Sequence, residues 1–241
     1  MFQTIFRNMG PAIKNILIIN VLMFLAKVVL ENQGVNLGQI LGMFYPSSPF
    51  FRIWQPLTHV FMHANFNHLF FNMLSLLFLG IHLENYWGTK RFLIYYFVTA
   101  FGAAFLHFGI QGVEIYSATG SFFPSLPVNF DAYTGMIEYL PTVPNSKFVA
   151  LIYVTPTVGA SGALYGLIMA YAYLFPNTEF LLYFAIPVKA KWLALGLGVY
   201  ALYSGWANNA GDSVAHFAHL GGMIFGFILL KFWQKKLTQF Y

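Results

Sequence analysis

Six long apolar segments constrain the fold more than any other feature of the sequence. A helix needs roughly 20 mostly apolar residues to cross the hydrocarbon core of a bilayer, which is about 30 Å thick. The segments lie at residues 12–31, 66–83, 90–110, 157–175, 188–207 and 213–233. We therefore expect an all-α polytopic membrane protein, a bundle of six transmembrane helices in a lipid bilayer. It would form a single domain over residues 1–241, with short tails at 1–11 and 234–241.

The composition fits a membrane protein and excludes several other classes. Only 8% of the residues are charged and 59% are hydrophobic, whereas about 25% charged residues is usual for a soluble domain. This excludes a cytosolic enzyme, a disordered chain and a basic nucleic-acid-binding protein, so we expect no nucleic-acid partner. The chain has no cysteine, which excludes disulfides, thiolate metal sites and a cysteine nucleophile.

The positions of Lys and Arg predict the orientation, because cytoplasmic loops of membrane proteins carry an excess of these residues. With both termini on one side, that side holds Arg7, Lys14, Lys90, Arg91, Lys189, Lys191, Lys231, Lys235 and Lys236. The opposite side holds only Arg52 and Lys147, and Lys27 can snorkel there from the end of the first segment. We therefore expect both termini to be cytoplasmic.

Two outer loops follow from this orientation. Residues 32–56 are apolar and aromatic with almost no charge, so they are expected to lie in the membrane interface. Residues 111–146 contain four prolines, which predicts a long irregular exoplasmic loop. The apolar stretch at 147–155 is too short to span, and it either leads into the fourth helix or lies in the interface.

Polar residues within a membrane are costly and often mark a functional site. The first such cluster contains His59, His63, His68 and Asn72. His68 and Asn72 are four residues apart, so they share one helix face and both could donate hydrogen bonds. They could equally join two helices, since His and Asn often form interhelical hydrogen bonds. A metal site at His59 and His63 lacks a third ligand at a suitable spacing.

The second cluster is the sequence GASG at residues 159–162, near the start of the fourth segment. Glycines beside Ser161 would let another backbone or a substrate approach its hydroxyl. Backbone N–H groups at the start of a helix can also bind an anion. Taken alone the pattern fits ordinary packing, because Gly162 and Gly166 form a face of small residues.

The third cluster contains His216, His219, Gly222 and Gly226. The last three are spaced three and four apart, so they form one stripe of the sixth segment. The glycines would let this helix lie directly against the start of the fourth, which brings an imidazole beside the hydroxyl of Ser161. His216 could share that side of the helix, and either histidine could be structural.

Together the clusters supply the parts of a serine hydrolase. A serine nucleophile needs a base that takes its proton and donors that hold the oxyanion. Ser161 would be the nucleophile and His219 the base. The backbone N–H of Ser161, His68 and Asn72 are available as oxyanion donors. All of them lie near the predicted outer ends of their helices, where water for hydrolysis could reach them.

With these motifs in this order, the sequence resembles the rhomboid family of intramembrane serine proteases over residues 12–233. In that family a His and an Asn four apart on the second helix help to form the oxyanion hole, and His68 and Asn72 match them. The family's GxSG sequence matches residues 159–162, with Gly159 and Gly162 beside the serine. The resemblance thus implies that Ser161 is the nucleophile.

Further motifs of the family match the fourth and sixth segments. A tyrosine four residues after the serine, which packs against the catalytic histidine, matches Tyr165. An alanine-histidine pair followed by glycines at +3 and +7 matches His219, Gly222 and Gly226. This implies catalysis at His219 and leaves His216 as a structural neighbour.

The resemblance implies peptide-bond hydrolysis by a Ser–His dyad through an acyl-enzyme, with no metal and no cofactor. The substrates would be transmembrane segments of other proteins. The enzyme would be a multi-pass protein of a bacterial plasma membrane whose site opens to the exoplasmic side. A zinc protease would need HExxH, which is absent. An aspartyl protease would need two intramembrane carboxylic acids, whereas Asp131 and Asp212 both fall in predicted outer loops.

Two other functions are compatible with parts of this pattern. An inactive rhomboid-like protein would bind transmembrane helices without cleaving them, although Ser161 and His219 are both present. A transporter or haem-binding protein could use the histidines, but it would not explain GASG.

The family's helix-capping glutamate matches Glu84, which we expect to be structural. The sequence predicts no particular oligomeric state.

Overall fold

The computed structural model describes residues 9–124, 128–130, 137–139, 146–182, 185–207 and 215–238. The first half contains α2 (Pro11–Glu31), α3 (Leu37–Leu41), α4 (Gln55–Thr58), η1 (His59–Phe61), α5 (Phe66–Ser75), the π-helical turn η2 (Leu76–Gly80), α6 (Ile81–Trp87) and α7 (Thr89–Thr119). The second half contains β1 (Val128–Phe130), β2 (Ile137–Tyr139), α8 (Ser146–Val154), α9 (Ser161–Leu174), β3 (Glu179–Leu182), β4 (Ile186–Lys189), α10 (Ala190–Ala207) and α11 (His216–Thr238). The fold is mostly helical, and two antiparallel hairpins, β1–β2 and β3–β4, add to the predicted helices.

Four helices of the described chain are long and apolar enough to cross a membrane. They are α2, the continuous helix Phe66–Trp87, α7 and the stretch His216–Gln234 of α11. The other two predicted spans are helical but shorter, since α9 has 14 residues and α10 has 18. The protein is therefore a polytopic membrane protein, and the count of six spans stays a prediction.

Several helix boundaries differ from the sequence expectation. Helix α7 runs nine residues past the expected end at 110 and stops at Gly120, whose φ of 74° is left-handed, so any outer loop begins only near residue 120. Helix α8 is separate and ends at Val154. Pro156 has no N–H and disfavours helix in the residue before it. The stretch at 147–155 therefore does not lead directly into the fourth helix.

The segment before α9 is extended rather than helical. Thr157 pairs with Met43, through N–H···O distances of 2.8 and 2.9 Å in the two directions. This pairing delays the start of the fourth helix from the expected residue 157 to Ser161.

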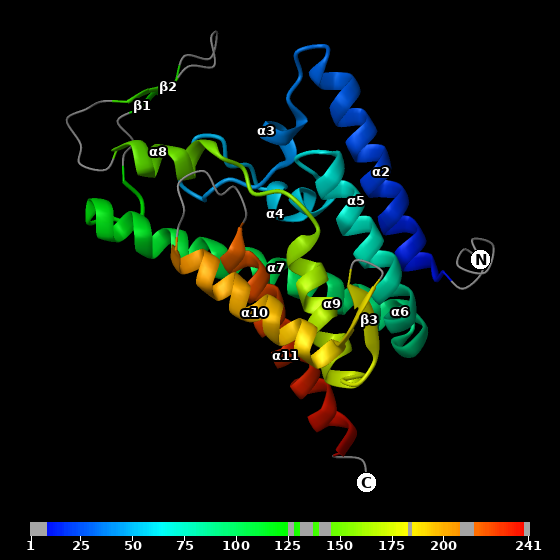
Figure 1. The fold of residues 1–241 in the computed structure, drawn as a ribbon. Coiled ribbons are helices and arrows are strands. Elements are labelled where there is room, and N and C mark those ends of the chain that lie inside the picture. Colours follow the sequence, from blue (N-terminus) through cyan, green and yellow to red (C-terminus); the bar gives the residue numbers. More distant parts are fainter. Residues whose placement is uncertain are drawn as a thin grey trace.

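Helices α7, α9 and α11 pack against one another in the centre of the bundle. Helix α10 packs on α9 and α11, while α2 contacts α5, η2 and α6. Figure 1 shows α3, α4 and α8 in its upper half, together with the end of α2 and the start of α9. We call this the upper end of the bundle. Helix α6 and the end of α11 lie at the lower right.

Glu84 on α6 fixes the start of α2. Its two carboxylate oxygens accept the backbone N–H groups of Ala12 and Ile13 at 2.9 and 3.0 Å, and Thr89 Oγ1 donates to it at 2.8 Å. The glutamate is buried, and a negative charge at a helix N-terminus is favourable. These contacts are those of a structural residue, as expected from the sequence.

Gln55 organises the segment that crosses the upper end. Its side chain is fully buried, with Oε1 accepting from Arg52 N–H at 2.9 Å and Nε2 donating to Phe50 O at 2.9 Å. Ser48 Oγ also donates to Tyr153 O of α8 at 2.6 Å. Residues 48–55 are thus held by internal hydrogen bonds and by α8.

Candidate active site

The structure brings Ser161 and His219 into hydrogen-bond contact, although they are 58 residues apart in sequence. Ser161 is the first residue of α9 and His219 lies in the first turn of α11. The distance between Ser161 Oγ and His219 Nε2 is 2.9 Å. A neutral imidazole at this distance can accept the hydroxyl proton, which is the geometry that an activated serine needs.

Glycines set the approach of the helices that carry this pair. A Cβ added at Gly222 would lie 1.9 Å from the carbonyl oxygen of Gly162, and one added at Gly226 would clash with the hydroxyl of Tyr95. The same hydroxyl donates to Gly166 O at 2.9 Å. Helices α9 and α11 therefore touch through their backbones, one turn below the Ser161–His219 pair.

The imidazole of His219 is fixed by an aromatic neighbour. The ring of Tyr165, one turn after Ser161, stacks on it with centroids 4.1 Å apart and planes 6° apart. His216 packs edge-on against Tyr200 of α10, with centroids 5.7 Å apart, and edge-on against His219, with centroids 6.3 Å apart. Of the two histidines that the sequence leaves open, His219 is the one that contacts the serine.

His68 and Asn72 border Gly159, two residues before Ser161. A Cβ at Gly159 would lie 2.8 Å from His68 Nε2 and 3.6 Å from Asn72 Nδ2, and the φ of 121° also favours glycine. Asn72 is buried, and its Nδ2 has no hydrogen-bond partner in the described chain. An unpaired buried donor is costly unless a ligand pairs with it. This amide is therefore available to donate a hydrogen bond to a ligand oxygen beside Ser161.

The hydrogen bond at Nδ1 of His68 indicates which of its two ring nitrogens carries the proton. Ala64 N–H donates to Nδ1 at 3.5 Å, which leaves the ring proton on Nε2, the nitrogen that faces Gly159. The side chain of Asn65 caps α5 by accepting from His68 N–H at 2.9 Å. His68 can thus act as a second N–H donor beside Ser161.

The remaining histidines of this cluster have structural contacts. His59 Nδ1 lies 3.0 Å from the carbonyl of Gln55, and its own carbonyl accepts Gly159 N–H at 2.9 Å, so it holds the GASG segment in place. Burial lowers the pKa of His59 to about 4, so the ring is neutral at pH 7. His63 packs edge-on against His68. In the part of the chain that the structure describes, no group of three or more His, Cys, Asp or Glu could hold a metal ion.

One contact near the site is not apparent from the sequence. Lys27 of α2 donates from Nζ to the carbonyl of Ala64 at 2.7 Å, beside His68. In the sequence Lys27 is only a basic residue at the end of an apolar segment, and no local pattern connects it with residues 37 positions away.

Comparison with known proteins identifies the family. A family model described as a Rhomboid domain matches residues 51–235. An uncharacterized mitochondrial rhomboid protein of Schizosaccharomyces pombe is 30% identical over 207 residues, which cover 77% of this chain and 53% of that protein. Rhomboid protease GlpG of Yersinia pestis is 23% identical over 237 residues, or 97% of this chain and 66% of that protein.

A third relative matches a shorter region. Rhomboid-like protease 3 of Toxoplasma gondii is 39% identical over 62 residues, which cover 25% of this chain and 24% of that protein. The chain spans between about half and two thirds of the length of the first two relatives. Because the Rhomboid-domain match extends over well more than half of the chain and includes both Ser161 and His219, this protein belongs to the rhomboid family.

Proposed function

We propose that this protein is an intramembrane serine endopeptidase that hydrolyses peptide bonds in or near transmembrane segments of other membrane proteins. The observation that carries the proposal is the 2.9 Å contact between Ser161 Oγ and His219 Nε2. Relatives named rhomboid protease GlpG and Rhomboid-like protease 3 support a proteolytic role. The alternative is an inactive family member that binds transmembrane helices, and an intact Ser–His pair argues against it.

The geometry supports a two-step mechanism. His219 takes the proton of Ser161 as Oγ attacks the carbonyl carbon, and the resulting imidazolium then protonates the leaving amine. Water hydrolyses the acyl-enzyme by the same base catalysis. The ring of Tyr165 holds the plane of the imidazole, as a hydrogen-bonded carboxylate does in a triad.

The negative charge that forms on the carbonyl oxygen needs donors. His68 Nε2–H and Asn72 Nδ2–H both border Gly159. The backbone N–H of Ser161 lies at the start of α9, where the helix dipole favours an anion. We assign these three groups to the oxyanion hole. Preorganised donors of this kind stabilise the transition state more than the ground state, so they act mainly on kcat.

We infer that the chain crosses the membrane six times, with α9 and α10 as the two further spans. Helix α9 has 14 residues, so it rises about 21 Å and is shorter than the bilayer core. Ser161 at its upper end would then lie below the membrane surface, where a substrate helix can meet it. The excess of Lys and Arg on one side supports cytoplasmic termini and a site open to the exoplasmic side. We propose a bacterial plasma membrane as its location.

A substrate helix must unwind locally before it is cut. Carbonyl groups within a helix are hydrogen-bonded and shielded by side chains, so the Ser161 hydroxyl could not reach them. We infer a single domain that requires no metal or cofactor for this chemistry.

The test is cleavage of a purified transmembrane substrate by the detergent-solubilised protein. Cleavage should disappear in Ser161→Ala and in His219→Ala. His216→Ala is the matched control, because it removes an imidazole three residues away on the same helix and should keep most of the activity. Cleavage by Ser161→Ala at the wild-type rate would show that the assignment is wrong.

A graded loss should mark the oxyanion donors. Loss of one such donor costs on the order of 100- to 1,000-fold in kcat in a well-studied protease. Asn72→Ala should therefore retain measurable cleavage, since His68 and the backbone N–H of Ser161 remain. A wild-type protein that captures a transmembrane helix without cutting it would favour the inactive alternative.

A further inference from the structure

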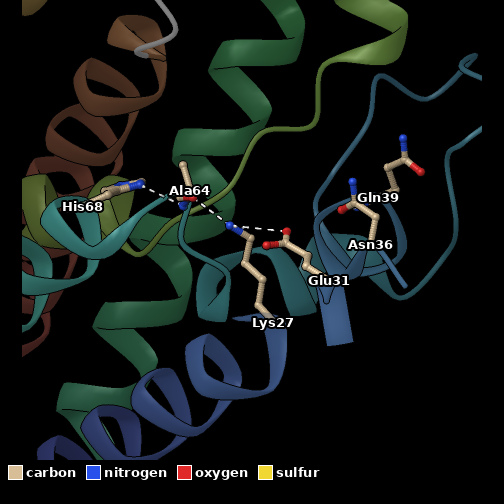
Figure 2. Close-up of polar contacts among 6 residues, drawn as sticks. All are labelled: Lys27, Glu31, Asn36, Gln39, Ala64 and His68. Atoms are coloured by element: carbon tan, nitrogen blue, oxygen red, sulfur yellow. Dashed lines mark hydrogen bonds and ion pairs between the residues drawn. The ribbon is translucent and has the colours of Figure 1, made fainter. Parts of the chain in front are cut away.

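Lys27 reaches from α2 to the turn that precedes α5. Its Nζ donates to Ala64 O at 2.7 Å and lies 3.6 Å from a carboxylate oxygen of Glu31 (Figure 2). The side chain of Lys27 is only 14% exposed, whereas that of Glu31 is 40% exposed. The side chain of Lys27 is thus mostly buried, and the shorter of these two polar contacts is with the backbone of another element.

Figure 2 shows Ala64 between Lys27 and His68. Its carbonyl accepts from the lysine, and its N–H donates to His68 Nδ1 at 3.5 Å. Residues 62–65 have no regular secondary structure, and Ala64 and Asn65 are exposed. The turn therefore depends on individual contacts, and the lysine makes one of them from a separate helix.

The hydrogen bond from Ala64 to His68 favours the tautomer that carries its proton on Nε2. At 3.5 Å it is at the long end of what a hydrogen bond tolerates, so a small displacement of Ala64 breaks it. Without this donor the Nδ1–H tautomer becomes available, and Nε2 then faces Gly159 as an acceptor. An acceptor there repels an oxyanion instead of holding it.

We propose that Lys27 is a positioning residue for the oxyanion donor His68. By holding the Ala64 carbonyl, the ammonium keeps the Ala64 N–H on Nδ1 and the ring proton on Nε2. This inference rests on the proposed protease function. It gives Lys27 a role that neither its ion pair with Glu31 nor its place on the predicted outer side explains.

Three variants separate this role from general stabilisation. Lys27→Met removes the donor, Lys27→Arg retains a cationic donor, and Glu31→Gln removes the ion pair but leaves the bond to Ala64. Cleavage of the transmembrane substrate is measured as kcat and KM per active site. The sites are counted by labelling Ser161 to completion with a fluorophosphonate, so partly unfolded preparations do not distort the result.

We expect Lys27→Met to lower kcat about tenfold with KM within about twofold, since the bound substrate gains from the oxyanion donor only in the transition state. Lys27→Arg should recover most of kcat, and Glu31→Gln should match the wild type. A wild-type kcat in Lys27→Met overturns the proposal, and so does an equal loss in Lys27→Met and Lys27→Arg.

A second measurement does not require activity. With ¹⁵N-labelled histidine, the ring signals of His68, assigned by their loss in His68→Ala, should report a proton on Nε2 in the wild type. In Lys27→Met they should shift towards the other tautomer, and unchanged signals overturn the proposal. Failure of the proposed function gives a different result, because the wild type would then cleave no faster than Ser161→Ala. The tautomer of His68 would still show whether Lys27 positions the ring.

Discussion

Gly222→Ala tests directly whether backbone contact between two helices assembles the site. The added Cβ would lie 1.9 Å from the carbonyl oxygen of Gly162 and 2.9 Å from its carbonyl carbon. Both atoms belong to the backbone of α9, so no side chain can rotate away. Real Cβ atoms essentially never come closer than 3.0 Å to another heavy atom. The helices must therefore separate locally by about 1 Å.

A displacement of this size acts on the catalytic pair itself. Gly162 follows Ser161 directly and Gly222 lies one turn after His219, so the 2.9 Å contact between hydroxyl and imidazole lengthens as the helices part. A misplacement of about 1 Å can cost about 100-fold in rate, and overpacking costs about 1–3 kcal/mol in stability. We expect a loss of kcat of about 100-fold together with a lower Tm.

The assay compares cleavage of a fluorogenic transmembrane substrate with thermal unfolding in the same detergent. Gly109→Ala on α7 is the matched control, because nothing lies within 4 Å of a Cβ added there. Alanine is favoured over glycine in a helix by about 1 kcal/mol, so this variant should cleave normally with an equal or higher Tm. Gly222→Ala with wild-type kcat and Tm would refute the backbone contact.

Three further predictions concern side chains at the site and at the start of α2. Tyr165→Phe keeps the stacked ring and should cleave normally, whereas Tyr165→Leu should lose up to about tenfold in kcat, since such ring pairs contribute about 0.5–1.5 kcal/mol; equal rates for the two variants would contradict the role of the ring. Glu84→Gln should lower stability by about 1–3 kcal/mol, seen as a lower Tm with unchanged cleavage per active site, because two buried N–H groups lose a charged acceptor. Burial lowers the pKa of His59 from 6.5 to about 4, so between these pH values the unfolded chain binds a proton that the folded chain does not. Above pH 6.5 both states are neutral, and Tm should therefore fall as the pH drops from 6.5 to 4, less steeply in His59→Gln.

The core of the candidate site could be predicted because its signals are local. Gly222 is one turn from His219 and Gly162 is next to Ser161, so glycine spacing alone indicates which helix faces meet. His68 and Asn72 are one turn apart, and any helix presents them together. Each of these inferences needs only the period of a helix and the small size of glycine.

Other features depend on contacts that no local pattern encodes. The start of α9 at Ser161 follows from the pairing of Thr157 with Met43, more than a hundred residues earlier. The last turns of α7 contribute Ile115 to a buried cluster with Val149 and Tyr153 of α8, a contact that the prolines of residues 111–146 do not indicate. From the sequence, Lys27 bears only on orientation, because its hydrogen bond joins it to a turn 37 residues away.

The two halves of the site differ in how firmly they are held. Lipid tails are as apolar as the side chains of membrane helices, so the hydrophobic effect does not drive these helices together. Close packing therefore contributes much of the free energy of their association. The approach of α9 and α11 beside Ser161 and His219 is set by such packing, backbone against backbone. His68 is instead set by an exposed turn, one long hydrogen bond and a lysine from another helix. We therefore expect perturbations at the upper end to weaken oxyanion stabilisation before they separate the dyad, so that kcat falls while Ser161 still reacts with a fluorophosphonate.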